Sequence, residues 1–206
     1  MMGSRSLKRA DKSRGAALVE FALVLPLLVT LVMGIFEFGN LWRQVGSLER
    51  AAHQGARAVA AQANGRYADF EGLRGVDAVT RGLSGITVER VIVYRATAAD
   101  GKVPNACLTG SVAGLCNVYT GAQVRPGSPV GFPSGSLSNP TCAGGSWDSA
   151  WCPVGRPRSE MDPIRIGLHL TVTYEPVTGF FPGVQSTIER YAVFQIEPCA
   201  QGQSEC

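Results

Sequence analysis

Glu20 is the residue whose surroundings point most directly to a chemical role. It is the only charged residue from Gly15 to Phe36, in a stretch made almost entirely of apolar and small residues. A carboxylate inside such a segment is costly if the segment lies in a membrane, so Glu20 is a candidate functional residue. The alternative is that Glu20 is protonated there, or that its side chain extends to the lipid headgroups.

The cysteines are a second group with a definable chemistry. There are six, all beyond residue 100, and an even number in an exported domain favours disulfide bonds whose connectivity stays open. Zinc binding is the weaker alternative, because there is no C-x-x-C motif and the chain has only two histidines. Pairing between neighbours in the sequence would give Cys107–Cys116, Cys142–Cys152 and Cys199–Cys206.

The remaining polar residues form no recognisable catalytic pattern. His53 lies among small residues, and His169 falls on the polar side of an alternating segment without a visible partner. Asp148, Glu160 and Asp162 are scattered through a glycine-rich region, where sparse carboxylates are usually solvated. Nucleophile elbows, phosphate loops and metal-ligand clusters are not recognisable. We therefore expect a protein that is not an enzyme and has no cofactor or metal.

The element that carries Glu20 is long enough to cross a membrane. Residues 16–36 form a run of 21 residues, about 31 Å long as a helix, against a hydrocarbon core of about 30 Å. Residues 1–15 hold five basic side chains and one acidic side chain. This asymmetry predicts a single-pass protein of the cytoplasmic (inner) membrane, with a cytoplasmic N-terminus and an extracytoplasmic C-terminal part.

Simpler interpretations of this segment are open. A cleaved secretory signal peptide would have an apolar region of about 7–15 residues and then a small-residue cleavage site, whereas Glu37-Phe38-Gly39 follows here. A buried helix of a soluble protein would usually show a polar face. A plain signal anchor explains the apolar run and the basic flank, but it leaves Glu20 unexplained.

The order of residues around Glu20 is more specific than its hydrophobicity. A basic leader ends in Gly15, and Glu20 is the fifth residue after it, at the head of the apolar helix. This is the pattern of the class III signal peptides of pilins and pseudopilins. The run RGAALVEFALVLPLL, continued by Glu37-Phe38-Gly39, resembles the TadE/TadG-like family, the pilin-like proteins of tight-adherence Flp-type pili. The resemblance is strong to about Val59.

The resemblance implies a processing site and a set of partners. A prepilin-type peptidase would cut between Gly15 and Ala16, and Glu20 would pair with the new Ala16 amine of a neighbouring subunit. Such a pair is physically reasonable, because opposite charges in a medium of low dielectric constant compensate each other's desolvation. The implied partners are the membrane, the peptidase, other pilin-like subunits and the pilus assembly platform, and the protein would be incorporated into a pilus.

The helix is predicted to continue beyond the membrane. Residues 39–64 place apolar and small residues near helical spacing and charged residues on the other faces. Asn64-Gly65 is a typical helix end, so a helix over residues 16–63 would be about 70 Å long. We expect residues 1–15 to lack regular structure.

Beyond this helix the spacing changes. Residues 66–84 predict a short helix, and the β-branched residues of 86–95 predict a strand. Strict alternation over 164–175 predicts a half-buried antiparallel strand, which would pair with a last strand over 187–197. The intervening turn, Val177–Val184, is apolar and either exposed or packed against the long helix.

Residues 96–163 are the least regular part of the chain. They contain four of the six cysteines, and disulfides are the natural constraint for so long a region of weak periodicity. A short strand near Val118 and Tyr119 is the one element we expect there. Trp147 and Trp151 are candidates for a ligand or partner surface, or for a local core around a disulfide.

These patterns predict an α+β fold. A long N-terminal transmembrane pilin-like helix would pack on an extracytoplasmic antiparallel β-sheet with a disulfide-stabilised irregular loop region. The expected boundaries are 1–15 for the leader, 16–38 for the transmembrane helix, 39–64 for its extracytoplasmic continuation, and 65–206 for the outer domain.

The expected function is structural: a minor pilin or pseudopilin-like component that initiates, caps or assists a filament and so supports adhesion. Without the leader the chain has 14 basic and 15 acidic residues, which gives no electrostatic reason to expect nucleic acid, and we expect no small-molecule substrate. The second hypothesis is an uncleaved, signal-anchored module that uses residues 96–163 to bind a ligand or the cell wall. An exported enzyme with a site assembled from scattered residues is the third.

Overall fold

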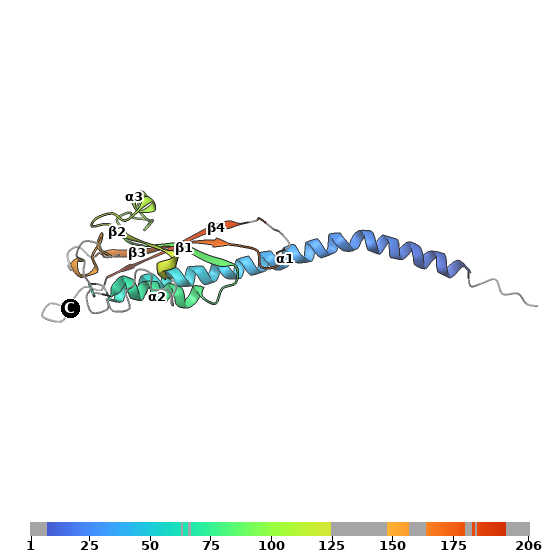
Figure 1. Cartoon of the computed structure of the whole chain (residues 1–206), viewed down its shortest axis with the longest axis horizontal. Coiled ribbons are helices and arrows are strands. Elements are labelled where there is room, and N and C mark those ends of the chain that lie inside the picture. The colour runs from blue at the N-terminus through green and yellow to red at the C-terminus, as the bar shows by residue number, and fades with distance from the viewer. Residues whose placement is uncertain are drawn as a thin grey trace, which may run out of the picture.

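The computed structural model describes residues 8–62, 64–65, 67–124, 148–156, 164–179, 183 and 185–196. Its longest element is α1, a single helix from Lys8 to Gln62, about 82 Å long at 1.5 Å per residue. Figure 1 shows the first half of α1 projecting away from the rest of the molecule and the second half lying along the sheet. The helix begins ahead of Ala16, so the expectation of an irregular leader is wrong from Lys8 onward. Lysine, arginine and alanine, which are good helix formers, dominate this stretch.

Four strands form one antiparallel sheet in the order β2–β1–β3–β4. Their bounds are Ile86–Arg95 for β1, Cys116–Thr120 for β2, Arg165–Tyr174 for β3 and Ser186–Gln195 for β4. The β3–β4 register runs from Arg165 opposite Gln195 to Tyr174 opposite Ser186. The predicted α+β fold is therefore confirmed, with its early strand, its short strand and its terminal antiparallel pair.

One face of the sheet is covered by α1 and by α2, a helix from Ala68 to Thr80. The two helices approach closely because glycines lie at their contact. A Cβ on Gly72 would lie 2.2 Å from Cγ2 of Val59, and one on Gly55 would lie 2.7 Å from Cγ2 of Val76. The main core lies between these helices and the sheet, and it includes Leu48, Val59, Leu73, Val91, Leu168 and Leu170.

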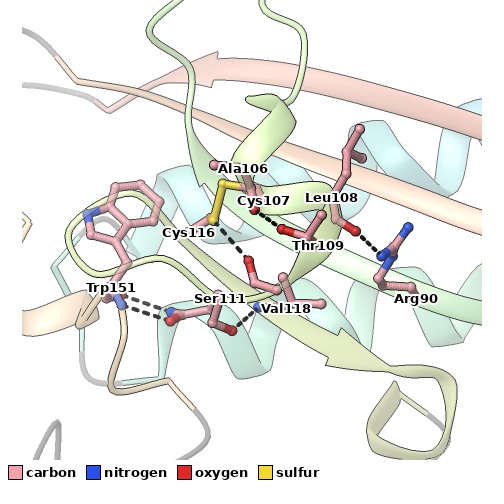
Figure 2. Close-up of a disulfide and its surroundings, with 11 residues drawn as sticks. Arg90, Ala106, Cys107, Leu108, Thr109, Ser111, Cys116, Val118 and Trp151 are labelled. Carbon is pink, nitrogen blue, oxygen red and sulfur yellow. Dashed lines mark hydrogen bonds between the residues drawn. A yellow bond between two sulfur atoms is a disulfide. The ribbon is translucent and has the colours of Figure 1, made fainter.

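The other face of the sheet is covered by the segment between β1 and β2, which contains the short helix α3 (Asn105–Thr109). A second apolar cluster forms there around Ile92, Tyr94, Cys107 and Cys116. The Cys107–Cys116 disulfide closes this segment (Figure 2), as predicted. Arg90 of β1 also donates a hydrogen bond to the Leu108 carbonyl at 2.5 Å, which ties the cover to the sheet.

The prediction that β3 has one solvated face is wrong. His169 and Thr171, on the face away from the helices, are only 3% and 7% exposed. Gly167 on the same face lies against the ring of Tyr94, where a Cβ would be 2.1 Å from Cζ. Small and polar side chains on this face thus leave room for the second apolar layer, and alternation alone does not reveal that layer.

Candidate processing site, membrane anchor and docking sites

The three residues predicted to form the processing site lie near the start of α1. Gly15, Ala16 and Glu20 are all exposed, and a Cβ on Gly15 would meet nothing within 4 Å. Because residues four apart share a helix face, Glu20 lies one turn beyond Ala16 on the same face. No described residue forms a hydrogen bond or ion pair with Glu20. Its carboxylate is therefore accessible to a group from another molecule.

Apart from the partly buried Met33, the large apolar side chains from Leu18 to Phe36 are exposed, from 39% for Val29 to 75% for Leu23. Within the described part of the chain, α1 is the one helix long and apolar enough to cross a membrane, and none of its most apolar window is buried in the protein. By length and composition this half of α1 is a single-pass membrane anchor.

Pro26 and Thr30 are the two residues of the anchor that affect backbone hydrogen bonding. Pro26 has no amide hydrogen, yet α1 continues through it. The Thr30 hydroxyl donates a hydrogen bond to the Pro26 carbonyl at 2.8 Å. The one hydroxyl of the anchor is thus satisfied inside the helix, as an apolar environment requires.

Glu37 is where α1 joins the outer domain, and it is only 7% exposed. Its carboxylate accepts hydrogen bonds from the Tyr174 hydroxyl at 3.0 Å and from the amides of Thr178 and Val177 at 2.7 and 3.3 Å. The Thr178 hydroxyl donates a further hydrogen bond to it. Val177 and Thr178 at the start of the apolar turn after β3 are therefore hydrogen-bonded to α1, yet both residues are exposed, so each of the two predicted alternatives holds in part.

The role of Glu37 was missed in the sequence, where the residue served only as part of a family pattern. The available signal was a carboxylate at the boundary of an apolar run. Asn40, one turn further along α1, supports the same contact, because its side-chain amide lies 3.4 Å from the Tyr174 hydroxyl. Together these contacts fix the end of β3 to the helix.

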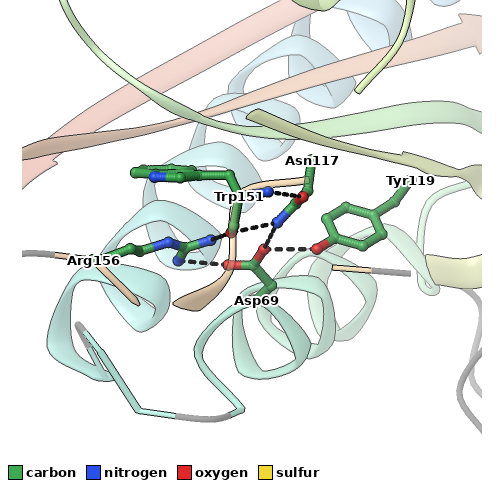
Figure 3. A network of polar contacts seen from close by, with 5 residues as sticks. All are labelled: Asp69, Asn117, Tyr119, Trp151 and Arg156. Atoms are coloured by element: carbon green, nitrogen blue, oxygen red, sulfur yellow. Dashed lines mark hydrogen bonds and ion pairs between the residues drawn. The ribbon is translucent and has the colours of Figure 1, made fainter. Parts of the chain in front are cut away.

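At the other end of the domain, Figure 3 shows a buried polar network centred on Asp69 of α2. One Asp69 oxygen lies 2.7 Å from Nη1 of Arg156, and both side chains are fully buried. The other oxygen accepts hydrogen bonds from the Tyr119 hydroxyl at 2.6 Å and from the Asn117 amide at 2.9 Å. Burial and the adjacent Asp69 charge raise the pKa of Tyr119 well above its ordinary value, so Tyr119 remains a donor.

Trp151 connects the same network to the segment 148–156, which contains the short helical turn η2 (Pro153–Gly155). The Arg156 guanidinium lies 4.0 Å from the Trp151 ring centroid. Asn117 exchanges two hydrogen bonds with the Trp151 backbone, at 2.8 and 2.9 Å. The network therefore holds α2, β2 and the segment 148–156 together. The sequence did not reveal it, because its members are far apart in the chain.

This arrangement corrects one prediction and decides between two alternatives for another residue. Asp148 is 2% exposed rather than solvated. Trp151 is 6% exposed and packs in the main core, which excludes the open ligand or partner surface for Trp151 and is closer to the alternative of a buried core. Both follow from the way the segment 148–156 folds back onto α2 and β2. Trp147, Glu160 and Asp162 lie outside the described residues.

The other cysteines are only partly described. Cys152 is disulfide-bonded, but Cys142, Cys199 and Cys206 lie outside the described residues. The pairings Cys142–Cys152 and Cys199–Cys206 therefore stay predictions. No group of three or more His, Cys, Asp and Glu side chains in the described part of the chain could hold a metal ion.

The two histidines lie in different surroundings. His53 is exposed on α1, with its ring edge-on to Phe194 at a centroid distance of 6.0 Å. His169 is buried in β3, and its Nε2 lies 3.8 Å from an oxygen of Glu189. Burial lowers the pKa of His169, and this effect outweighs the opposing effect of Glu189.

Comparison with known proteins finds a similarity that covers most of α1. A family model described as TadE-like protein matches residues 15–57, which include Gly15, Glu20, the anchor and Glu37. No curated protein and no solved structure matches the chain. The predicted resemblance is confirmed over this segment. Residues 15–57 of α1 are thus similar to the TadE-like family.

Proposed function

We propose that the protein is a minor pilin-like or pseudopilin-like component of a tight-adherence pilus or a related secretion system. Its role is structural, in filament initiation, capping or assembly, and so in surface adhesion. The observation that supports this most directly is Glu20. It lies exposed on an apolar helix, one turn from Ala16, and no described residue compensates its charge.

In this proposal a prepilin-type peptidase on the cytoplasmic side cuts between Gly15 and Ala16. Cleavage creates an amine at Ala16 and removes the basic leader. The Glu20 carboxylate of one subunit then pairs with the Ala16 amine of a neighbour inside the membrane or filament, where each charge offsets the desolvation of the other. The half of α1 that packs on the outer domain (residues 37–62, the docked half) is continuous with the anchor. The position of the anchor therefore sets the position of the outer domain.

The test is the N-terminal residue of the membrane-extracted protein, determined by mass spectrometry in cells with and without their prepilin peptidase. We expect a mature chain that begins at Ala16 only when the peptidase is present. A mature chain that begins near Met1 in both cells would overturn the proposal. It would favour the uncleaved, signal-anchored binding module instead.

Two variants separate processing from assembly. Gly15→Val should block cleavage, because the residue before the cut becomes bulky. Glu20→Gln should leave cleavage intact but reduce pili, measured in sheared surface fractions. Glu49→Gln is the matched control, because Glu49 is an exposed carboxylate on the docked half of the same helix. Normal piliation with Glu20→Gln would contradict the proposed pairing.

A further inference from the structure

The apolar surface of α1 ends abruptly just beyond the anchor. Phe38 and Trp42 are 66% and 73% exposed, and their ring centroids lie 6.4 Å apart. No large apolar side chain of α1 after Trp42 is exposed. Exposed positions further along carry polar side chains such as Glu49, Arg50 and Arg57.

The positions of these two aromatic residues match the headgroup layer of a bilayer. They lie two and six residues beyond Phe36, about 3 and 9 Å further along the helix axis. The polar layer on each side of the hydrocarbon core is about 5–8 Å thick. Because helix side chains point toward the N-terminus, the Trp42 ring reaches back into that layer. Tryptophan is enriched at this interface, and phenylalanine and arginine occur on the apolar and polar faces of interfacial helices.

The turn after β3 lies at the same level. The amides of Val177 and Thr178 donate to Glu37, the residue next to Phe38. Val177 is 48% exposed. Arg43 follows Trp42 and is also exposed, with its guanidinium donating to Asn40 at 3.2 Å.

We propose that Phe38, Trp42, Arg43 and Val177 form a collar that binds the lipid headgroups of the leaflet from which the outer domain emerges. The aromatic rings and Val177 lie among the glycerol and upper acyl groups, and Arg43 binds phosphate. Lipid is the occupant, because the apolar exposure is continuous with the anchor and stops at one depth. A protein partner along the docked helix would need apolar exposure beyond Trp42. The outer domain is thus seated directly on the membrane by α1 and by the turn after β3.

The first test measures the depth of the Trp42 side chain in a lipid bilayer. The full chain is reconstituted into phosphatidylcholine vesicles that carry a nitroxide at the headgroup, at acyl carbon 5 or at acyl carbon 12. The difference between the wild type and Trp42→Phe isolates the fluorescence of Trp42. We expect the headgroup and carbon-5 labels to quench it about twofold more than the carbon-12 label.

Three results would overturn the proposal. Quenching of Trp42 by aqueous iodide alone would place the collar in water. Strongest quenching by the carbon-12 label would place it in the hydrocarbon core. Protection from lipid quenchers that rises with the protein-to-lipid ratio would make a second copy of the chain the occupant.

The second test asks whether the turn after β3 touches lipid. Val177→Trp and Val154→Trp are each made in the Trp42→Phe background. Both positions are exposed, 48% and 53%, but Val154 lies in η2, at the end of the domain away from the anchor (Figure 1). We expect headgroup-label quenching of Val177→Trp and iodide quenching alone of Val154→Trp. Equal responses at the two positions would show that the turn after β3 does not contact the membrane, and would overturn the proposal. Neither test depends on cleavage or on pilus assembly.

Discussion

The two halves of α1 belong to one continuous helix but have opposite relations to the rest of the chain. Residues 15–36 are exposed or only partly buried on every face. Residues 37–62 bury one stripe completely, with Leu48, Ala52, Ala56 and Val59 at 0% exposure. The first half is apolar on all sides and the second half is amphipathic. The sequence of the first half therefore suits a surrounding lipid phase, and that of the second half suits packing on the outer domain.

The same contrast holds for the two carboxylates Glu20 and Glu37. Glu37 accepts its hydrogen bonds from Tyr174, Val177 and Thr178 of the outer domain, whereas Glu20 has no described partner. A carboxylate held inside the fold contributes to the folding free energy. A carboxylate without a partner in its own chain can contribute only to the free energy of binding another molecule. Substitutions in the two halves should therefore separate stability from assembly.

The largest effect on stability is expected for a core side chain of the docked half. Leu48→Ala removes a fully buried side chain and should lower the free energy of unfolding by about 2–5 kcal/mol, through lost burial and the cavity left behind. Leu31→Ala is the control in the anchor, where Leu31 is 54% exposed. It should leave the outer domain unchanged. Urea unfolding of the full chain in detergent, followed by tryptophan fluorescence, measures both. Equal losses of stability for the two variants would contradict the conclusion that only the docked half of α1 stabilises the outer domain.

Glycines on the same helix provide the next test. Gly55→Ala places a Cβ 2.7 Å from Val76 and 2.8 Å from Leu168, and the overpacking should destabilise the domain by about 1–3 kcal/mol. A Cβ on Gly46 would meet nothing within 4 Å. Gly46→Ala should therefore stabilise the helix by about 0.5–1 kcal/mol. The two thermal midpoints should move in opposite directions, and shifts of the same sign would show that α1 and α2 pack less closely than described.

Glu37, at the junction between the two halves of α1, allows the two carboxylates to be compared directly. Glu37→Gln keeps the shape but weakens the hydrogen bonds from Thr178, Val177 and Tyr174, because a charged acceptor is stronger than a neutral one. The expected loss is about 1–2 kcal/mol in the same unfolding experiment. Glu20→Gln is the matched control and should leave the unfolding curve in place. A larger loss for Glu20→Gln would mean that the anchor contributes to the outer fold.

How much could be predicted from the sequence follows the same division. The anchor and the β1 and β3 strands depend on local spacing, so hydrophobicity and alternation were sufficient. The pattern proposed as a processing site could be recognised because Gly15 and Glu20 are only five residues apart in the sequence. Glu37 and Thr178, or Asp69 and Arg156, are joined only by the tertiary fold, and no local pattern links them. The prediction that the second face of β3 is solvated was wrong for a related reason. The burial of that face depends on which distant segment lies over Gly167 and His169.

The smallest expected effect is a pH dependence that comes from the face of β3 that was thought to be solvated. Burial lowers the pKa of His169, the nearby Arg90 charge lowers it further, and Glu189 opposes both. A pKa lower in the folded state than the ordinary value of about 6.5 means that the unfolded chain binds the proton more readily. The contribution of His169 to stability is therefore fully present above about pH 6.5, falls as the pH drops through that value, and levels off below the pKa of the folded state. His169→Gln should remove this part of the slope between about pH 7.5 and 5.5, measured as the difference from the wild type. His53→Gln, at an exposed position of α1, should leave the slope unchanged. If the wild type instead gained stability over His169→Gln on acidification, the ion pair with Glu189 would outweigh burial, and this face of the sheet would be closer to solvent than its 3% exposure indicates.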